Sequence, residues 1–489
     1  MSTLLRFSLA LAVAAAAAFV CAPAGATPPP VAPHPIFTGS PVPGATASPG
    51  SGGFFSGIGR RSELFGDMFG FRTWLSRYGM TLNASETSED LGNVSGGYRQ
   101  GFIYDGLTQA DLQLDTQRAF GFYGGTFNVS ALQIHGKDVS AENLGTLQTA
   151  SGIEADRATR LWELWYQQSL SRDHLFDVKI GQQSLDQEFM VNQNASLFVN
   201  TMFGWPMLPS ANLPGGGPAY PLSALGARVR DQVTDGLLVL GGLFNGSPVA
   251  NNAGDPQQQN PSGLSFPLNG GVLAIAELQY TYPTLNTIVY GDRPEPLART
   301  IKLGFWYDSE RFPDLAVAEN GFPLVSPASN GVPRQHQGNY SMYATVDQLI
   351  YQSKSDPYRT VSVFGRAMGD PLGASNVIEV SVNGGLVLHE PIPHRRDDTL
   401  GIGWGYTHVS PGAMLADQYT AQYANAATPV RTGEAFVEAS YQYMLYPWLQ
   451  LQPDVQYVLN PGGGILNVNP PFRKVQNEAV IGLRTIIQL

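Results

Sequence analysis

Apolar and polar residues alternate strictly in two neighbouring runs near the C-terminal end of the chain. Between Leu449 and Leu459 most odd positions are apolar, whereas the even positions carry mainly amides and a carboxylate. Residues 435–445 show the same alternation, and Tyr446-Pro447-Trp448 joins the two runs. Successive side chains of a β-strand point to opposite faces, so each run predicts a strand with one apolar and one polar face. Each run spans about ten residues, the length of a tilted transmembrane strand, whereas strands of soluble proteins are more often about five or six residues long. The hairpin therefore predicts a membrane β-barrel.

Similar alternation recurs along the whole chain and predicts roughly sixteen strands, with fourteen or eighteen also compatible with the pattern. The fold class that we predict is all-β: a transmembrane antiparallel β-barrel of about 16 strands, preceded by a short N-terminal helical or plug segment at Leu64–Leu75. Besides the opening hairpin, the predicted strands lie at 79–85, 111–115, 126–131, 162–167, 176–180, 227–230, 236–244, 271–282, 299–308, 340–352, 358–368, 376–386, 399–408 and 476–488.

The connections between these strands alternate in length. Short turns, such as 171–174 and 446–448, separate long segments rich in Pro, Gly, Asn or Gln. Outer-membrane barrels have short turns at one end and long loops at the other, whereas long structureless loops are uncommon in soluble domains. The final strand keeps its apolar parity to Leu489, as expected when the last strand closes a barrel against the first. The predicted long loops are 183–221, 246–270, 310–338 and 410–431.

The N-terminal region divides into two segments before the predicted barrel. Residues 1–26 combine Arg6, a short apolar run and Ala24-Gly25-Ala26, which is typical of a cleaved signal peptide; an N-terminal membrane anchor is the alternative. Cys21, the single cysteine, lies in this segment, so the mature chain is expected to hold no disulfide. Residues 27–59 are rich in Pro and Gly and predict a flexible linker, which leaves 60–489 for the barrel domain.

Composition supports this class of protein. Charged residues make up 14% of the 489 residues, well below the approximately 25% typical of soluble domains. Beyond the N-terminus no apolar run reaches the roughly 18 residues of a transmembrane helix. The net charge of -11 argues against a nucleic-acid partner, because nucleic-acid binders carry basic patches.

No motif in the chain supports an enzyme or a cofactor. We find no nucleophile elbow, no phosphate-binding loop and no zinc-protease motif. His389 and His394 raise the possibility of a metal site, but Pro391 and Pro393 break any helix that would place both histidines on one face. We therefore predict neither a metal nor a cofactor, and we interpret residues 395–398 as a polar turn.

Several motifs in order along the chain resemble the carbohydrate-selective porins of the OprB family. The resemblance covers the chain from about residue 60 to the end. It implies a monomeric sixteen-stranded barrel that passes sugars through a constriction of Arg and acidic residues. Two positions depart from the family pattern: Met68-Phe69-Gly70 stands where Trp-Gly-Gly is usual, and Gln182 stands where Arg is frequent. The strongest motifs are Pro391–Tyr406 (PIPHRRDDTLGIGWGY) and Gln452–Gly463 (QPDVQYVLNPGG); further matches are Leu64–Leu75, His135–Gln148, Arg160–Gln168, Val178–Phe189, Gly242–Pro248 and Gln348–Tyr351.

A lumen that selects sugars needs hydrogen-bond donors, acceptors and aromatic faces, because each sugar hydroxyl both donates and accepts. Residues of these types share the inward parity of the predicted strands or lie close to them. We expect Arg160, Glu163, Arg228 and Glu188 to be the most important. A solvated pore wall is the alternative for every charged residue, and an interfacial aromatic belt is the more common role for Trp162, Trp165 and Tyr166. The full candidate set is Arg160, Glu163, Arg228, Glu188, Arg230, Arg157, Lys137, Asp186, Lys179 and Trp165.

Together these observations predict an outer-membrane porin of a Gram-negative cell that lets small carbohydrates diffuse passively into the periplasm. The expected partners are small sugars and outer-membrane lipid, without nucleic acid. The resemblance implies a monomer, and a trimer stays open. A general or ion-selective porin is the first alternative. An outer-membrane enzyme acting on lipid and a soluble secreted β protein are the others.

Overall fold

A computed structural model describes residues 57–250, 254–283, 298–423, 428–470 and 472–489 of the chain. Within these ranges, sixteen strands account for most of the fold. In chain order they are β1 Met80–Ser95, β2 Gly101–Asp115, β3 Gly125–Gly136, β4 Ala158–Ser169, β5 Phe176–Gln183, β6 Ala224–Thr234, β7 Leu237–Asn245, β8 Val272–Tyr282, β9 Arg299–Ala318, β10 Pro333–Gln352, β11 Thr360–Gly369, β12 Ile378–His389, β13 Thr399–Val409, β14 Gly433–Tyr446, β15 Leu449–Leu459 and β16 Glu478–Gln488.

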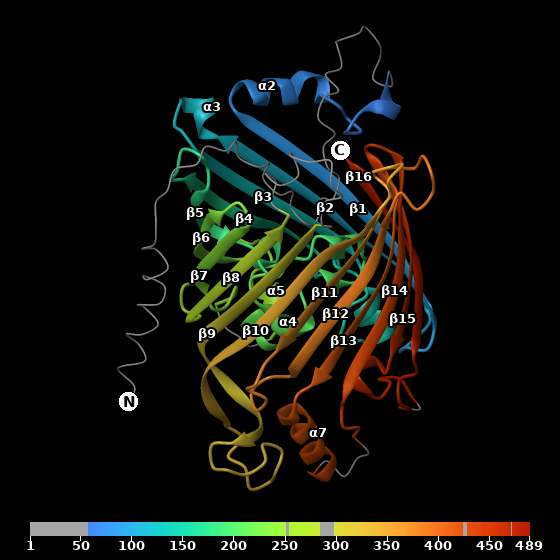
Figure 1. Cartoon of the computed structure of the whole chain (residues 1–489). Helices are drawn as coiled ribbons and strands as arrows, with labels where there is room; N and C mark the ends of the chain where they lie inside the picture. Colours follow the sequence, from blue (N-terminus) through green and yellow to red (C-terminus); the bar gives the residue numbers. More distant parts are fainter. Residues whose placement is uncertain (1–56, 251–253, 284–297, 424–427, 471) are drawn as a thin grey trace.

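The strands form one closed antiparallel barrel in sequence order (Figure 1). The barrel closes where β1 pairs with β16, with Glu89 opposite Arg484. Closure leaves no strand edge exposed, as a membrane requires because hydrocarbon offers no hydrogen-bond partner. Each of the sixteen predicted segments lies on a strand of its own, so the predicted fold class and strand number are confirmed.

Short helical pieces lie between the strands and before the first one. They are η1 Ile58–Arg60, η2 Met68–Gly70, α2 Phe71–Arg77, α3 Thr116–Phe120, η3 Ser140–Leu144, η4 Leu185–Gln187, η5 Asn194–Leu197, η6 Thr201–Phe203, α4 Met207–Asn212, η7 Pro214–Gly216, α5 Pro256–Gln259, α7 Pro411–Tyr423 and η8 Pro461–Gly463. None of the described helices is long and apolar enough to cross a bilayer.

The two ends of the barrel differ in the length of their connections. One end carries α2, α3, the C-terminus and tight turns such as the one between β14 and β15 (top of Figure 1). Short turns mark the periplasmic end of an outer-membrane barrel. The opposite, extracellular end carries the long loops and α7.

The predicted N-terminal helix is present, and it lies at the periplasmic rim (Figure 1). In α2 the Arg72 guanidinium donates to the carbonyl oxygen of the C-terminal Leu489 at 2.7 Å, which links the helix to the point of barrel closure. The sequence predicted either a helix or a plug for this segment, and the position of α2 at the rim favours the helix. The predicted signal peptide at 1–26 and nearly all of the predicted linker at 27–59 lie outside the described residues.

Two predicted loops contain more regular structure than expected. The segment 310–338 was expected to be irregular, but β9 and β10 extend through it as twenty-residue strands, leaving only 319–332 as their connection. Prolines favour a loop because they cannot donate a ladder hydrogen bond. Here Pro313 and Pro333 lie beside irregularities in the strand pairing, where no such N–H is required, so both strands continue through them. The segment 410–431 includes the thirteen-residue helix α7.

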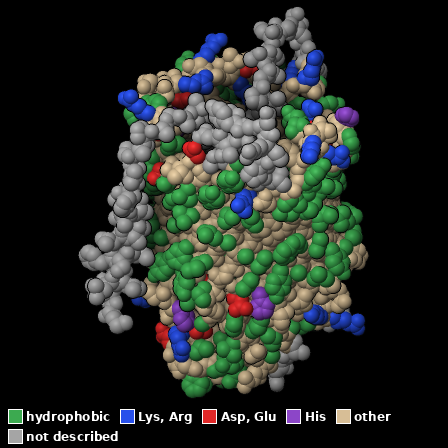
Figure 2. Space-filling view, in the orientation of Figure 1, with side chains coloured by type: hydrophobic (Ala, Val, Ile, Leu, Met, Phe, Trp, Pro, Cys, Tyr) green, Lys and Arg blue, Asp and Glu red, His purple; other side chains and the backbone are tan. Residues whose placement is uncertain are grey.

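The barrel buries polar residues inside and exposes apolar residues outside. On β15, Gln452, Asp454 and Gln456 are almost completely buried, whereas Val455 and Tyr457 are exposed. The amide face of the opening hairpin is therefore the inner wall, and its apolar face meets the membrane. Figure 2 shows hydrophobic side chains spread over the side of the barrel.

Candidate functional site

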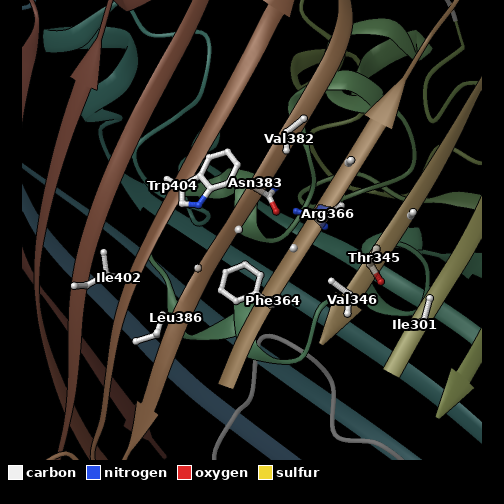
Figure 3. A pocket seen from close by; sticks show the side chains of 15 residues that line it. Ile301, Thr345, Val346, Phe364, Arg366, Val382, Asn383, Leu386, Ile402 and Trp404 are labelled. Carbon is white, nitrogen blue, oxygen red and sulfur yellow. The ribbon is translucent and has the colours of Figure 1, made fainter. Parts of the chain in front are cut away.

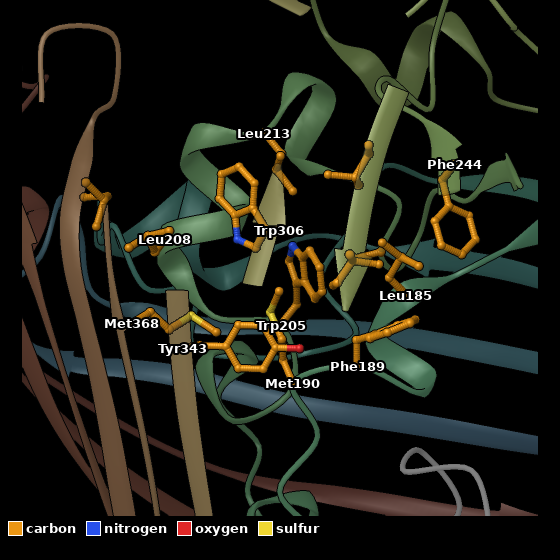
Figure 4. Packing of buried hydrophobic residues seen from close by; sticks show 14 of the residues in the cluster. Leu185, Phe189, Met190, Trp205, Leu208, Leu213, Phe244, Trp306, Tyr343 and Met368 are labelled. Carbon is orange, nitrogen blue, oxygen red and sulfur yellow. The ribbon is translucent and has the colours of Figure 1, made fainter. Parts of the chain in front are cut away.

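The loop between β5 and β6, residues 184–223, folds into the barrel and fills part of its lumen. Its apolar residues pack on apolar residues of the inner wall, so this part of the barrel has a hydrophobic core (Figure 4). Leu185, Phe189, Met190, Trp205, Leu208 and Leu213 come from the loop; Trp306, Tyr343 and Met368 come from β9, β10 and β11. The inserted loop therefore occupies part of the space that the barrel encloses.

Arg366 of β11 binds the backbone of this loop. Its guanidinium donates to the carbonyl oxygens of Met190 at 2.7 Å and Gly204 at 2.9 Å, and also to that of Met202. The side chain is buried, with 2% of its surface exposed. Arg366 thus satisfies the buried carbonyl groups of Met190 and Gly204, and it shares the carbonyl group of Met202 with the Asn383 amide.

Inward carboxylates bind backbone N–H groups of the same loop. Glu438 of β14 accepts from the N–H groups of two consecutive loop residues, and Asp347 of β10 does the same. Together with Arg366 they hold the loop against the wall of β8–β15. The contacts are Val199 N to Glu438 at 2.6 Å, Asn200 N to Glu438 at 3.1 Å, Gln193 N and Asn194 N to Asp347 at 3.1 Å each, and Met190 N to Glu277 at 2.8 Å.

A different arrangement of charges occupies the inner wall of β5 and β6. We name Asp177, Lys179, Glu188, Arg228 and Arg230 the β5–β6 cluster. Arg228 forms ion pairs with Asp177 and with Glu188, the latter with 2.6 Å between Nε and Oε2. Lys179 is paired with Glu188 as well, and Arg230 lies 3.6 Å from Asp177. The inward direction of the four strand residues follows from strand alternation. The fifth, Glu188, comes from the inserted loop.

The strand register explains why Glu188 is needed there. Lys179 and Arg228 are directly opposite each other on β5 and β6. Two like charges in opposite positions destabilise a sheet. The Glu188 carboxylate bridges both cations, so insertion of the loop and neutralisation of the wall depend on each other.

Glu163 and Trp165 of β4 extend the cluster. The indole N–H of Trp165 donates to Glu163 at 3.2 Å, and the Lys179 ammonium lies 4.6 Å from the centre of the Trp165 ring. Glu163 also accepts from the backbone N–H of Ser184, at the start of the inserted loop, at 3.0 Å. The result is a connected, mostly buried group of cations, carboxylates and an aromatic ring on the inner wall.

Of the remaining predicted residues, Asp186 adjoins this group through Ser184, which also binds Glu163, whereas Arg160, Arg157 and Lys137 form no ion pair with it among the described residues. Arg160 is buried on β4, and none of its three guanidinium nitrogens has a hydrogen-bond partner in the part of the chain that the structure describes. Arg157 is exposed, and Lys137 is exposed beside Glu142, at 3.8 Å. Asp186 accepts from the Ser184 hydroxyl at 2.6 Å and the Tyr220 N–H at 3.1 Å, so it stabilises the inserted loop; burial raises the pKa of its carboxyl group.

The expectation that Trp162 and Trp165 form an interfacial belt is wrong. Both side chains are buried inside the barrel, at 2% and 5% exposure. The inward direction of Trp165 agrees with its predicted parity. Trp162 faces inward because β4 has an irregularity there: Leu161 pairs with Ala131 and Glu163 with Ser130, which leaves Trp162 as an extra residue. A bulge of this kind has no signal in the alternation pattern.

Sequence reasoning missed Asp177 as a candidate, although its parity on β5 matches that of Lys179. It also missed Arg366, Asp347 and Glu438. These three share the inward parity of their strands, so alternation could have placed them on the inner wall. Their role could not be found in the same way, because their partners are backbone groups of a loop more than 140 residues earlier in the chain.

A closed sixteen-stranded barrel with an apolar exterior, a polar interior and an inserted loop is an outer-membrane porin. The sequence matches the family described as "Carbohydrate-selective porin, OprB family" over residues 99–489. The chain therefore belongs to the OprB family of carbohydrate-selective porins. It is a transport protein of the outer membrane and not an enzyme.

Individual relatives agree with this assignment. The chain is 23% identical over 437 residues to Porin B of Pseudomonas aeruginosa, covering 86% of this chain and 90% of the relative. It is 22% identical over 427 residues to the putative porin QuiX of Acinetobacter baylyi, covering 82% and 89%. The high-pH structure of Pseudomonas putida OprB matches the fold with a TM-score of 0.74 at 21% identity, covering 88% of this chain and 99% of that one.

Proposed function

We propose that the β5–β6 cluster, together with Glu163 and Trp165, forms the constriction at which this porin selects its sugars. The position of Arg228 is the main support for this proposal. Its guanidinium contacts Asp177 on the wall, Glu188 on the inserted loop and the Gln167 amide oxygen, the last at 3.2 Å. It thus lies where the loop meets the wall, which is where a passing solute is most confined.

The charge balance of this surface favours sugars over ions. Lys179, Arg228 and Arg230 give three cations, and Asp177, Glu163 and Glu188 give three carboxylates, so the formal sum is zero. An ion meets no net opposite charge, whereas a sugar hydroxyl finds both donors and acceptors. The Trp165 ring adds an apolar face for the C–H groups of a sugar. This balance argues against the alternative of an ion-selective porin.

One chain is sufficient for passage in this proposal. Every residue of the constriction comes from the same barrel, which agrees with the monomeric channel implied by the family resemblance. Association between copies is then a property of the outer surface and leaves the selectivity of the lumen unchanged.

Block of single-channel current by sugar in planar bilayers tests the proposal. With glucose as the probe, Arg228→Ala is expected to weaken the block about tenfold, because a charge-assisted hydrogen bond contributes roughly 1.5–3 kcal/mol. Arg157→Ala is the matched control, since its exposed guanidinium lies outside the constriction. If glucose at high millimolar concentration blocks neither protein, sugar selection at this site is ruled out.

Arg160→Ala completes the comparison. The sequence ranked Arg160 beside Arg228, and both are buried. Arg160, however, has no hydrogen-bond partner among the described residues and forms no ion pair there with the β5–β6 cluster, so we expect unchanged sugar affinity in Arg160→Ala. Equal loss of affinity in both variants would mean that the constriction extends along β4. Wild-type affinity in both would show that the constriction lies elsewhere in the lumen.

A further inference from the structure

An apolar hollow of about 780 Å³ lies on the outer face of β9–β13 (Figure 3). Small residues such as Gly365 and Gly384 form its floor, and Ile301, Leu386 and Trp404 lie at its sides. Lipid acyl chains match such a surface. This hollow therefore belongs to the membrane face of the barrel and selects no solute.

A second hollow, at the extracellular end of the barrel, has a polar lining. Its volume is about 500 Å³, within the range of small-molecule sites. The lining comes from the connections β1–β2, β3–β4, β7–β8 and β15–β16 and from the segment before β14. We name it the mouth pocket, and its principal polar residues are Tyr98, Asp138, Thr146, Glu154, Gln257 and Arg431.

Two glycines shape the wall of the mouth pocket. Gly145 and Gly462 both line it, and their φ angles of +87° and +63° lie in the left-handed region that favours glycine. A Cβ atom at Gly145 would overlap the Tyr98 ring, and one at Gly462 would lie 2.9 Å from the Gly145 carbonyl oxygen. The missing side chains therefore let the Tyr98 ring form part of the wall.

The carboxyl groups of the mouth pocket are not neutralised by cations. The neighbouring Arg99 and Lys137 pair with Glu142 instead, and neither Asp138 nor Glu154 forms an ion pair among the described residues. Burial, followed by the charge of Asp156, raises the pKa of Asp138 to about 6, so this carboxylate is still ionised at pH 7. The pocket thus carries an unpaired negative charge and an excess of acceptors.

Donors complete the lining. The Gln257 oxygen accepts from the Asp156 N–H at 2.7 Å, whereas its NH₂ group has no partner among the described residues. Arg431 binds Asp417 through two guanidinium nitrogens, at 2.9 Å each, which fixes the side chain and offsets its charge. The Thr146 hydroxyl oxygen is buried and has no hydrogen-bond partner in the described ranges. Buried polar atoms without partners are uncommon, and a bound hydroxyl compound supplies one.

The wall of the mouth pocket is joined to the inserted loop. Thr149 lines the pocket; its hydroxyl donates to Thr201 Oγ1 at 2.6 Å, and its carbonyl oxygen accepts from the Thr201 N–H at 3.2 Å. The Tyr220 hydroxyl also donates to the Ile153 carbonyl oxygen at 2.8 Å. The same loop carries Glu188 of the β5–β6 cluster. The mouth pocket and the proposed constriction are therefore built on one loop, with the pocket at the extracellular end.

We propose that the mouth pocket binds neutral sugars before they reach the constriction, as the first of two sites in series. The inference rests on the proposed function, because capture at the mouth serves transport only if the constriction passes sugars. Sugar hydroxyls donate to the excess acceptors and accept from Gln257, and the Tyr98 ring faces the C–H groups of the sugar. Asp138 repels the carboxylate of a sugar acid, so the pocket prefers the neutral sugar.

The sidedness of glucose block in planar bilayers tests the series arrangement. Glucose is added to one chamber, with channels whose orientation is known from a label on an extracellular loop. Asp138→Asn is expected to lower the association rate of extracellular glucose about tenfold and to leave that of periplasmic glucose unchanged. Glu319→Gln, at an exposed carboxylate of the same end, is the matched control and should change neither rate. Equal losses from both sides, or no loss, overturn the proposal.

Saturation-transfer NMR tests the pocket apart from the constriction. In an Arg228→Ala background, glucose is expected to keep a transfer signal that falls several-fold when Asp138→Asn is added, and gluconate should give a weaker signal than glucose. Loss of the glucose signal in Arg228→Ala alone, or equal signals from the two probes, overturns the proposal. If glucose does not block the wild type but this signal is present, the constriction fails and the mouth pocket is supported. If Arg228→Ala does not fold, the sidedness of block still decides.

Discussion

The inner wall of the barrel uses buried charges in two different ways. On β5 and β6, Lys179 and Arg228 pair with carboxylate side chains and lie beside the inserted loop. On β11 and β14, Arg366 and Glu438 bind backbone groups of that loop. Both sets consist of charged side chains that point into the barrel and are similarly buried. Their partners make the difference: the first set pairs with other charged side chains and belongs to the proposed constriction, whereas the second set holds backbone groups and supports the architecture.

Removal of an anchoring charge should have the largest effect on stability. Arg366→Ala leaves the Met190 and Gly204 carbonyl groups of the loop without their side-chain donor in a buried site, whereas the Met202 carbonyl keeps the amide of Asn383. Each unsatisfied group costs about 1–3 kcal/mol, so we expect a loss of roughly 2 kcal/mol or more. Thermal unfolding in detergent measures it as a lower Tm. Single-channel recordings should also become noisy as the loop moves. An unchanged Tm would show that Arg366 does not anchor the loop.

Glu438→Gln should have a smaller effect of the same kind. The amide oxygen can still accept one of the two N–H groups of Val199 and Asn200, but its NH₂ group faces the other N–H. We expect a loss of about 1–2 kcal/mol in thermal unfolding. The same substitution at the exposed Glu319 is the control, and a shift as large there would mean that burial is not the cause.

Glu188→Gln should change selectivity more than stability. Without the carboxylate, Lys179 and Arg228 give the constriction an excess positive charge. We expect the reversal potential in a salt gradient to shift toward anion selectivity and glucose block to weaken several-fold, as counter-ions accumulate at an uncompensated charge. If instead Tm falls as far as in Arg366→Ala with selectivity preserved, the distinction between the two walls fails.

Asp370→Asn should produce the smallest effect, visible as a change in pH dependence. Asp370 follows β11 and accepts from the Asn376 amide at 2.5 Å and from Asn212 of the inserted loop at 3.4 Å. Burial raises its pKa from 3.8 to about 6. The folded state therefore binds a proton more tightly than the unfolded state, and stability from this group falls as pH rises from about 4 to about 6.

The measurement for Asp370 is Tm at pH 5 and at pH 7. Wild type should gain stability on going from pH 7 to pH 5, and Asp370→Asn should gain less, because the amide does not titrate. Identical pH profiles for the two proteins would exclude Asp370 as the responsible group.

The strands of this protein could be predicted from the sequence because alternation is a local property. The polar face of Leu449–Leu459 is the inner wall, and the apolar parity of the last strand is the outer surface, as predicted. The pattern failed where the backbone departs from regular pairing: the bulge at Trp162 turned an outward position inward, and prolines concealed the extension of β9 and β10.

For the candidate site, the sequence by itself determined that Glu163, Lys179, Arg228 and Arg230 face the lumen, since each direction follows from strand parity. It did not separate Arg228 from Arg160, because the partners of an inward charge come from other strands and from a loop. Only the tertiary structure decided that Glu188 reaches Lys179 and Arg228, while Arg160 has no hydrogen-bond partner among the described residues. The physical reason is that alternation acts over two residues, whereas neutralisation of buried charge depends on contacts between segments far apart in the chain.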